Sequence, residues 1–251
     1  MPQRKEEFIN NEIYHITTRR IGDEILFENI DDYYRGIFSI YEFNNANPVA
    51  IQKRRRKIQE IKRKFRNGRG RASTVFVIPD ERNKLVEILT FSFMPNHIHL
   101  LIRQLQDNGI SKFMRKIGAG YGGYYNKKYQ RRGRLFDGRY RVIHIESDNQ
   151  LKIVFVYIHT NPAAILVLNW KEKGIDEKDF QKVLKFIEDY RWSSYSDYLG
   201  KKNFPSITTR EFLINELGGT KEAQRFINDW LHVKKKLRES YASTLKEISL
   251  E

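Results

Sequence analysis

The chain has 251 residues, of which 40% are hydrophobic, and this is enough apolar material for one large domain or for a core with a smaller appendage. It contains no cysteine, which excludes disulfides and cysteinyl zinc sites, and it has no run of the roughly 20 apolar residues that a membrane span needs. The formal net charge of +15 favours a polyanionic partner, with nucleic acid ahead of an anionic membrane surface. The first residues contain no apolar signal-peptide core, so we expect a cytoplasmic protein.

Two segments near the N-terminus predict a strand and a helix. Residues 12–19 alternate apolar and polar side chains and are rich in β-branched and aromatic types, which is typical of a strand. Residues 31–43 place apolar side chains at helical spacing after an acidic start that suits a helix N-terminus. The sequence NNANPV then ends this helix.

A basic block covers residues 53–71 and holds eleven Lys or Arg against one Glu. Such a block cannot pack in a core, and its Gly-Arg repeats are typical of a flexible arm. We interpret it as an insertion that follows a nucleic-acid backbone. This clustering argues against the alternative that the positive charge serves solubility only.

The segments after the basic block predict the remaining strands and helices of the core. Residues 86–93 and 97–103 predict two strands joined by an MPN turn. A helix, a strand and a second helix follow from the patterns over 110–129, 139–145 and 148–161. The order strand, helix, strand, strand, helix, strand, helix is that of a compact α+β fold on an antiparallel sheet, and the end of the chain predicts two or three short helices.

His97 and His99 are the first candidates for a functional site. Because successive side chains of a strand point to opposite faces, both imidazoles project to one side while Ile98 and Leu100 face the other. Two such imidazoles form half of a metal site, and a phosphate oxygen is a natural further ligand in so basic a protein. The alternative, that both are hydrogen-bonded histidines on a solvated face, stays open on the spacing alone.

Tyr157 and Asn161 lie four residues apart in the predicted helix and therefore share one of its faces, whereas His159 points elsewhere. A hydroxyl and an amide oxygen on one face could supply a nucleophile and a third metal ligand for phosphoryl transfer. Pro162 restricts the backbone at Asn161. Periodicity does not separate Tyr157 from a tyrosine that merely packs in a core, because the chain has 14 tyrosines.

The motif PNHIHLLI, followed later by YIHTNP, resembles the HUH single-tyrosine transposases, and most closely the REP-associated tyrosine transposases. The HUH element is His, a hydrophobic residue and His, which here are His97, Ile98 and His99. In that family the nucleophilic tyrosine lies on a helix near the end of the core, with Gln or Asn four residues later; Tyr157 and Asn161 occupy these positions. The segments YHITTR, GRLFDGRYR and WSSY are similar to the same family.

The resemblance implies a ferredoxin-like or RRM-like antiparallel sheet with flanking helices and a small helical C-terminal extension. It divides the chain into a catalytic core, 1–165, with a basic insertion at about 46–73, and a region 166–251 that holds an aromatic turn segment and the extension. The implied partner is single-stranded DNA with hairpin elements, with no membrane involved. A monomer and a homodimer both remain open.

The implied reaction is cleavage of single-stranded DNA by Tyr157, which gives a 5′-phosphotyrosine link and a free 3′-hydroxyl, followed by rejoining. Mg²⁺ or Mn²⁺ would be held by His97, His99 and Asn161. Tyr124 and Tyr125 are candidates for stacking on unpaired bases. Residues expected to bind the DNA backbone are the arginines of two basic segments: Arg54, Arg55, Arg56, Arg63, Arg66, Arg131, Arg132, Arg134, Arg139 and Arg141.

Two other functions remain compatible with these residues. The first is a nucleic-acid-binding regulator that keeps the fold without catalysis. The second is a metal-dependent nuclease that uses water, whose products would carry no tyrosine link.

Overall fold

A four-stranded antiparallel sheet forms the centre of the protein. The computed structural model describes residues 7–49, 52, 56–61, 63 and 80–232. The strand order is β2-β3-β1-β4, and every neighbouring pair is antiparallel. The strands are β1 (Ile13–Arg19), β2 (Val86–Phe93), β3 (His97–Gln104) and β4 (Arg141–His144).

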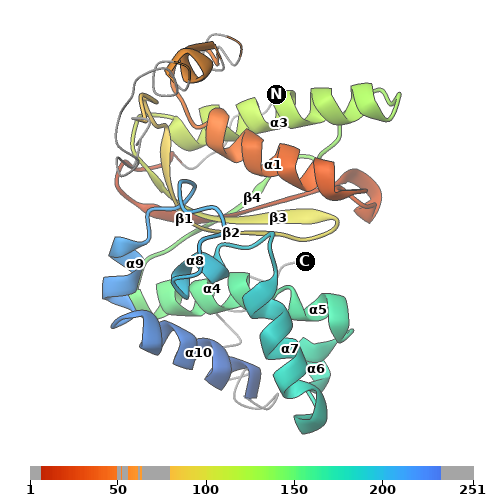
Figure 1. Ribbon diagram of the computed structural model, residues 1–251, viewed down its shortest axis with the longest axis vertical. Helices are drawn as coiled ribbons and strands as arrows, with labels where there is room; N and C mark the ends of the chain where they lie inside the picture. Colours follow the sequence, from red (N-terminus) through yellow and green to blue (C-terminus); the bar gives the residue numbers. More distant parts are fainter. Residues whose placement is uncertain (1–6, 50–51, 53–55, 62, 64–79, 233–251) are drawn as a thin grey trace.

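Helices cover both faces of this sheet (Figure 1). One face carries α1 (Ile30–Glu42) and α3 (Gly109–Lys128), and the other carries α4 (Asp148–Thr160) with the elements that follow it. This element order and strand order are those of the ferredoxin-like α+β fold, which confirms the predicted fold class. The other elements are η1 (Ile21–Asp23), α5 (Ala163–Leu166), α6 (Trp170–Lys173), α7 (Glu177–Asp189), α8 (Tyr195–Tyr198), α9 (Glu211–Glu216) and α10 (Thr220–His232).

The alternation along β3 sorts its side chains between the two helical layers. Ile98, Leu100 and Ile102 belong to the hydrophobic cluster under α1 and α3. Leu101 belongs to the second cluster, which contains the apolar side chains of α4. The face that carries His97 and His99 is therefore covered by a helix, so the alternative of a solvated histidine face is wrong.

A buried carboxylate joins the two helices of the first layer. Asp32 lies in the first turn of α1, where it forms a capping box with Asn29. It accepts hydrogen bonds from Tyr124 (2.9 Å), Tyr129 (2.6 Å) and Lys128 (2.6 Å) of the α3 region. Burial alone would raise the pKa of Asp32, but these hydrogen bonds outweigh it and lower the pKa.

The segment after α7 lies along the free edge of β2. Ser194 N–H donates to the carbonyl of Phe91 (3.0 Å), and the Tyr198 hydroxyl donates to the carbonyl of Leu89 (2.8 Å). The apolar side chains of α7, α9 and α10 share one hydrophobic cluster with α4. This layer therefore supports the helix that carries Tyr157. No helix among the described residues is long and apolar enough to span a membrane.

Candidate functional site

One row of side chains crosses three strands on the α4 side of the sheet. Thr17 of β1 lies opposite His99 of β3 and opposite Arg141 of β4, so the three share a face. One step along the strands, Arg19 lies opposite His97. The sheet register therefore places the two histidines beside a hydroxyl and two arginines.

A chain of hydrogen bonds fixes the tautomer of His97. The Asp23 carboxylate accepts from Arg19 (2.8 Å) and from the side-chain amide nitrogen of Asn96 (2.8 Å). The amide oxygen of Asn96 then lies 2.6 Å from His97 Nδ1. Since this oxygen can only accept, Nδ1 carries the hydrogen and the lone pair of a neutral ring is on Nε2.

His99 has the same tautomer for a different reason. The Asn161 amide nitrogen lies 2.5 Å from His99 Nε2, which must accept and therefore holds the lone pair. The hydrogen on Nδ1 faces His15 Nε2 at 3.0 Å and the Thr17 hydroxyl at 3.1 Å. His15 also stacks on His99, with ring centroids 5.2 Å apart, so this imidazole is held on two sides.

Helix α4 brings Tyr157 and Asn161 over the histidines. The Tyr157 ring stands perpendicular to that of His99, with centroids 5.6 Å apart. Its hydroxyl accepts a hydrogen bond from Lys171 Nζ of α6 at 3.2 Å, and the same ammonium lies 4.3 Å from the ring centroid. Tyr157 is only 2% exposed, so this conformation of the site is closed around its hydroxyl.

Pro162 does not distort the end of this helix. A residue before proline disfavours the helical region, yet Asn161 keeps φ −51° and ψ −40° and caps α4. Its N–H donates to the Tyr157 carbonyl (3.1 Å), so the two side chains remain one helical turn apart on the face toward β3. His159 points away from the site, as predicted, and its Nε2 bonds the Ser194 hydroxyl at 2.8 Å.

A small basic cavity adjoins the histidines. It has a volume of about 70 Å³ and is lined by Thr17, Arg19, Asp137, Arg139 and Arg141. Thr17 connects it to the histidines, because its hydroxyl lies 3.1 Å from His99 Nδ1. Arginine recognises phosphate through a fixed fork of N–H donors, so this cavity has the chemistry of a site for one phosphate group.

The side chains around the histidines offer nitrogen and oxygen donors to a divalent cation. Within the described parts of the chain, no group of three or more His, Cys, Asp or Glu side chains could hold a metal ion. The predicted set instead has two imidazoles and one amide. His97 and His99 both carry their lone pair on Nε2, with Nδ1 held by a neighbour, as metal-ligating histidines do. The set fits such an ion if Asn161 offers its amide oxygen in place of the nitrogen.

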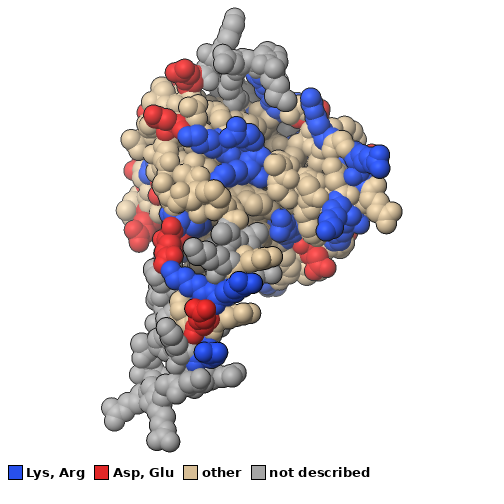
Figure 2. Space-filling view, turned by 90° about the horizontal axis from the view of Figure 1, so that it is seen from above, with Lys and Arg blue, Asp and Glu red and all other residues tan. Residues whose placement is uncertain are grey.

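The predicted DNA-binding arginines fall into two groups. Arg54, Arg55 and Arg66 lie outside the described residues, whereas Arg56 and Arg63 are described and exposed. Residues 56–61 are helical, so this part of the basic block is not the flexible arm that its composition suggests. Figure 2 shows Lys and Arg side chains in several groups on the α1 and α3 side of the molecule. The second set lies on the segment that leads into β4 and on the first residue of that strand, and it is mostly exposed: Arg131, Arg132, Arg134, Arg139 and Arg141.

The two tyrosines predicted to stack on bases are engaged in packing. Tyr125 is 1% exposed and hydrogen-bonds Arg20 (2.6 Å) and Glu28 (2.8 Å), so no base can reach its ring and this prediction is wrong. Tyr124 is half-buried, and its hydroxyl donates to Asp32. Helical periodicity showed which side chains share a face but not that α1 covers that face.

Three neighbours of the site, His15, Asn96 and Lys171, have no role that the sequence patterns predict. His15 could have been found, because it alternates with Thr17 on a strand that pairs with β3. The sequence places Asn96 in a turn but does not show that it bonds His97. Lys171 lies in α6, a four-residue helix, and no local pattern links it to Tyr157.

The middle of the chain matches a known protein family. Residues 46–161 match the family described as "Transposase IS200 like", which includes both the histidines and the tyrosine helix. This match confirms the resemblance to transposases that the sequence motifs indicated. A solved structure described as the REP-associated tyrosine transposase bound to a REP hairpin is similar over 84% of this chain and 93% of that chain, with a TM-score of 0.45 and 13% identity. No curated protein matches the chain.

Proposed function

From the match of residues 46–161 to the IS200-like transposases, we propose that this protein is a DNA strand transferase that works through a phosphotyrosine intermediate. The observation that carries the proposal is the convergence of His97, His99, Tyr157 and Asn161 on one covered face of the sheet. Its substrate is single-stranded DNA with hairpin elements, in keeping with the net charge of +15.

Tyr157 is the nucleophile of this reaction. Its oxygen forms a bond to phosphorus while the bond between phosphorus and the 3′ oxygen breaks. The hydroxyl proton passes to water, and the departing 3′ oxygen takes a proton from water. Attack by a 3′-hydroxyl on the same phosphorus then releases Tyr157 and joins two strands. The linkage keeps the energy of the phosphodiester, which hydrolysis would lose.

His97 Nε2, His99 Nε2 and the Asn161 amide oxygen would hold a Mg²⁺ or Mn²⁺ ion, which when bound neutralises and orients the phosphate. Neighbouring side chains prepare these ligands. Asn96 holds His97 by Nδ1, and His15 and Thr17 hold His99 by Nδ1. Hydrogen bonds of this kind, on the ring nitrogen that does not face the ion, fix the orientation and tautomer of the two histidines.

Lys171 positions the nucleophile. Its ammonium donates to the Tyr157 oxygen at 3.2 Å, so a positive charge is in place where negative charge develops as the proton leaves. The same charge stabilises the tyrosine oxygen when it departs in the rejoining step. Arg139, Arg141 and Arg19 bind the phosphate through the basic cavity beside Thr17.

The test is formation of a covalent protein–DNA adduct. Labelled hairpin oligonucleotides taken from the flanks of the gene are incubated with the protein in Mn²⁺ or in EDTA, and denaturant-resistant adducts are separated on a gel. We expect a metal-dependent adduct that is absent in Tyr157→Phe, while binding of the DNA stays nearly unchanged.

Tyr195→Phe is the matched control. Its hydroxyl is also buried on the α4 side and has no hydrogen-bond partner among the described residues, and this variant should form the adduct normally. Cleavage by Tyr157→Phe without an adduct would establish the water-using nuclease instead. Tight binding without cleavage by any form would establish a binding regulator.

A further inference from the structure

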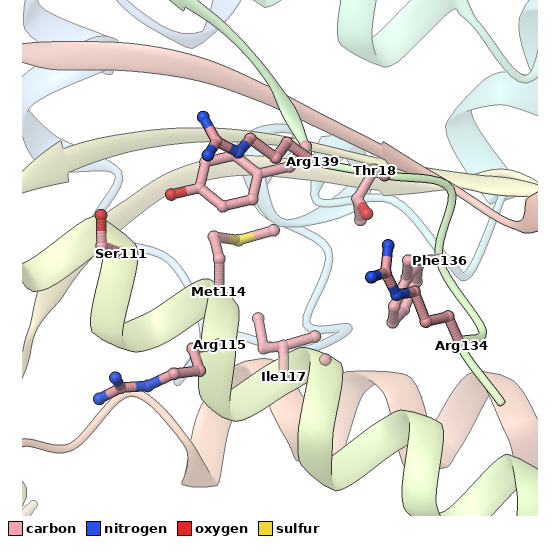
Figure 3. A pocket seen from close by; sticks show the side chains of 11 residues that line it. Thr18, Ser111, Met114, Arg115, Ile117, Arg134, Phe136 and Arg139 are labelled. Carbon is pink, nitrogen blue, oxygen red and sulfur yellow. The ribbon is translucent and has the colours of Figure 1, made fainter. Parts of the chain in front are cut away.

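A second, larger cavity lies on the opposite face of the sheet from the histidines. Its volume is about 490 Å³, and its lining includes Met114, Ile117, Arg134, Phe136, Arg139 and Tyr140. Met114 and Ile117 project from α3 toward Arg139 (Figure 3). Arg134 lies alongside Phe136, across the cavity from Met114. We refer to this space as the α3 cavity.

A bulge in the chain creates the α3 cavity. Arg141 pairs with Thr17 in the sheet, and Asp137 N–H donates to the carbonyl of Arg19 (2.8 Å). Residues 138–140 therefore lie opposite the single residue Thr18, and the extra length bows away from β1. Gly138, with φ +46°, supplies the left-handed backbone that this bend uses.

The volume and lining of the cavity fit a small ligand. Its volume lies within the range of about 300–1,000 Å³ that is typical of small-ligand pockets. Phe136, Tyr140 and Met114 supply aromatic and thioether surface, which suits a flat ring. Arg134 and Arg139 supply positive charge, and none of the described residues that line the cavity is acidic.

We propose that the α3 cavity binds one unpaired base of the DNA strand, with Arg134 and Arg139 on the phosphates beside that base. This proposal rests on the proposed function, since it takes single-stranded DNA as the substrate. A nucleotide is the ligand that combines an aromatic ring with adjacent anionic groups, and a ring stacked on aromatic side chains is a common mode of single-strand binding.

The position of Arg139 links the α3 cavity to the candidate active site. Arg139 lines both the α3 cavity and the small basic cavity beside Thr17. Thr17 and Thr18 are successive residues of β1, so their side chains lie on opposite faces of the sheet; Thr17 lines the small basic cavity and Thr18 lines the α3 cavity. A strand that passes over the 138–140 bulge could therefore hold a base on one face and present a neighbouring phosphate to the other.

Two glycines of α3 allow a matched test. A Cβ at Gly118, which lines the cavity, would meet no atom within 4 Å, so Gly118→Leu fills the space without a clash at Cβ. A Cβ at Gly123 would also meet none, but Gly123 lies on the same helix outside the cavity lining. Both leucines favour the helix, so both variants should fold.

The probe is a set of hairpin oligonucleotides with single-stranded flanks, each with 2-aminopurine at one flank position, measured in EDTA so that no chemistry occurs. We expect one position at which emission changes on binding, as the base passes from the DNA stack onto the aromatic side chains of the cavity, in the wild type and in Gly123→Leu. Gly118→Leu should lose this signal and bind about tenfold more weakly, the loss expected for one stacked base.

The proposal is overturned if no position responds in the wild type, or if Gly118→Leu matches Gly123→Leu in both signal and affinity. The adduct assay separates this failure from failure of the proposed function. An adduct without a base signal would remove the base site alone. A base signal lost only in Gly118→Leu, without any adduct, would keep the base site and remove the transferase.

Discussion

The contact between Lys171 and Tyr157 gives a direct prediction for the chemical step. Lys171→Met keeps an unbranched aliphatic side chain but removes the ammonium that donates to the Tyr157 hydroxyl at 3.2 Å and lies 4.3 Å from its ring centroid. If this charge stabilises the tyrosine oxygen as it attacks, its removal should slow adduct formation and leave DNA affinity nearly unchanged.

The size of the effect follows from the kind of bond that is lost. A hydrogen bond from a charged group contributes about 1.5–3 kcal/mol, which corresponds to a rate change of about 10- to 150-fold. Lys171 is half-buried, and solvent screens part of its charge, so the expected loss is at the lower end, about tenfold. Lys171→Arg keeps a positive donor on a long side chain and should recover part of the rate.

The assay is single-turnover adduct formation with excess protein in Mn²⁺. Lys173→Met is the matched control, because it removes the same charge from an exposed position of α6. An unchanged rate in Lys171→Met, or equal slowing in the two methionine variants, would refute a specific role for Lys171. A faster rate would also refute it and would show that the contact holds the site closed.

Two further predictions concern stability. Asp32→Ala leaves Tyr124, Tyr129 and Lys128 without their shared acceptor and should lower the free energy of unfolding, measured in urea, by about 3 kcal/mol. The control Asp31→Ala, at an exposed neighbouring position, should change this free energy by less than about 1 kcal/mol. Equal effects of the two variants would contradict the buried network. Burial lowers the pKa of His159 from 6.5 to about 3, so the unfolded chain binds a proton between these pH values that the folded chain does not. The stability that neutral His159 contributes should be complete above pH 6.5, and the free energy of unfolding should decrease by about 1.4 kcal/mol for each pH unit below 6.5. His159→Gln should flatten this dependence on pH, and an unaltered slope would exclude His159 as its source.

Local sequence patterns predicted the elements of the core well. The alternation from His97 to Arg103 and the turn before it predicted β3, which extends from His97 to Gln104. The helix with Tyr157 and Asn161 was predicted from residue 148, where α4 begins; the structure shows that its N-cap is Ser147. These elements depend on neighbours within a few positions, so a single sequence carries the information.

Contacts between distant segments were not predictable in the same way. The periodicity of α3 grouped Tyr124 and Tyr125 on one face, but only the packing of α1 and the loop before it shows that they bond Asp32 and Glu28. The pairing of Lys171 with Tyr157 likewise depends on how a four-residue helix packs on α4. Such contacts arise from tertiary packing, which local propensity does not encode.

The short fourth strand accounts for the positions of both cavities. If β4 continued its register, Tyr140 would pair with Thr18 and Arg139 with Arg19, and the sheet edge would be closed there. Pairing instead stops at Arg141 and resumes at Asp137, and the residues between them line the openings on both sides of β1. The bulge thus places Arg139 in the lining of both cavities. Deletion of Gly138, which shortens the bulge, should impair phosphate binding and base binding together. Gly118→Leu should impair base binding alone.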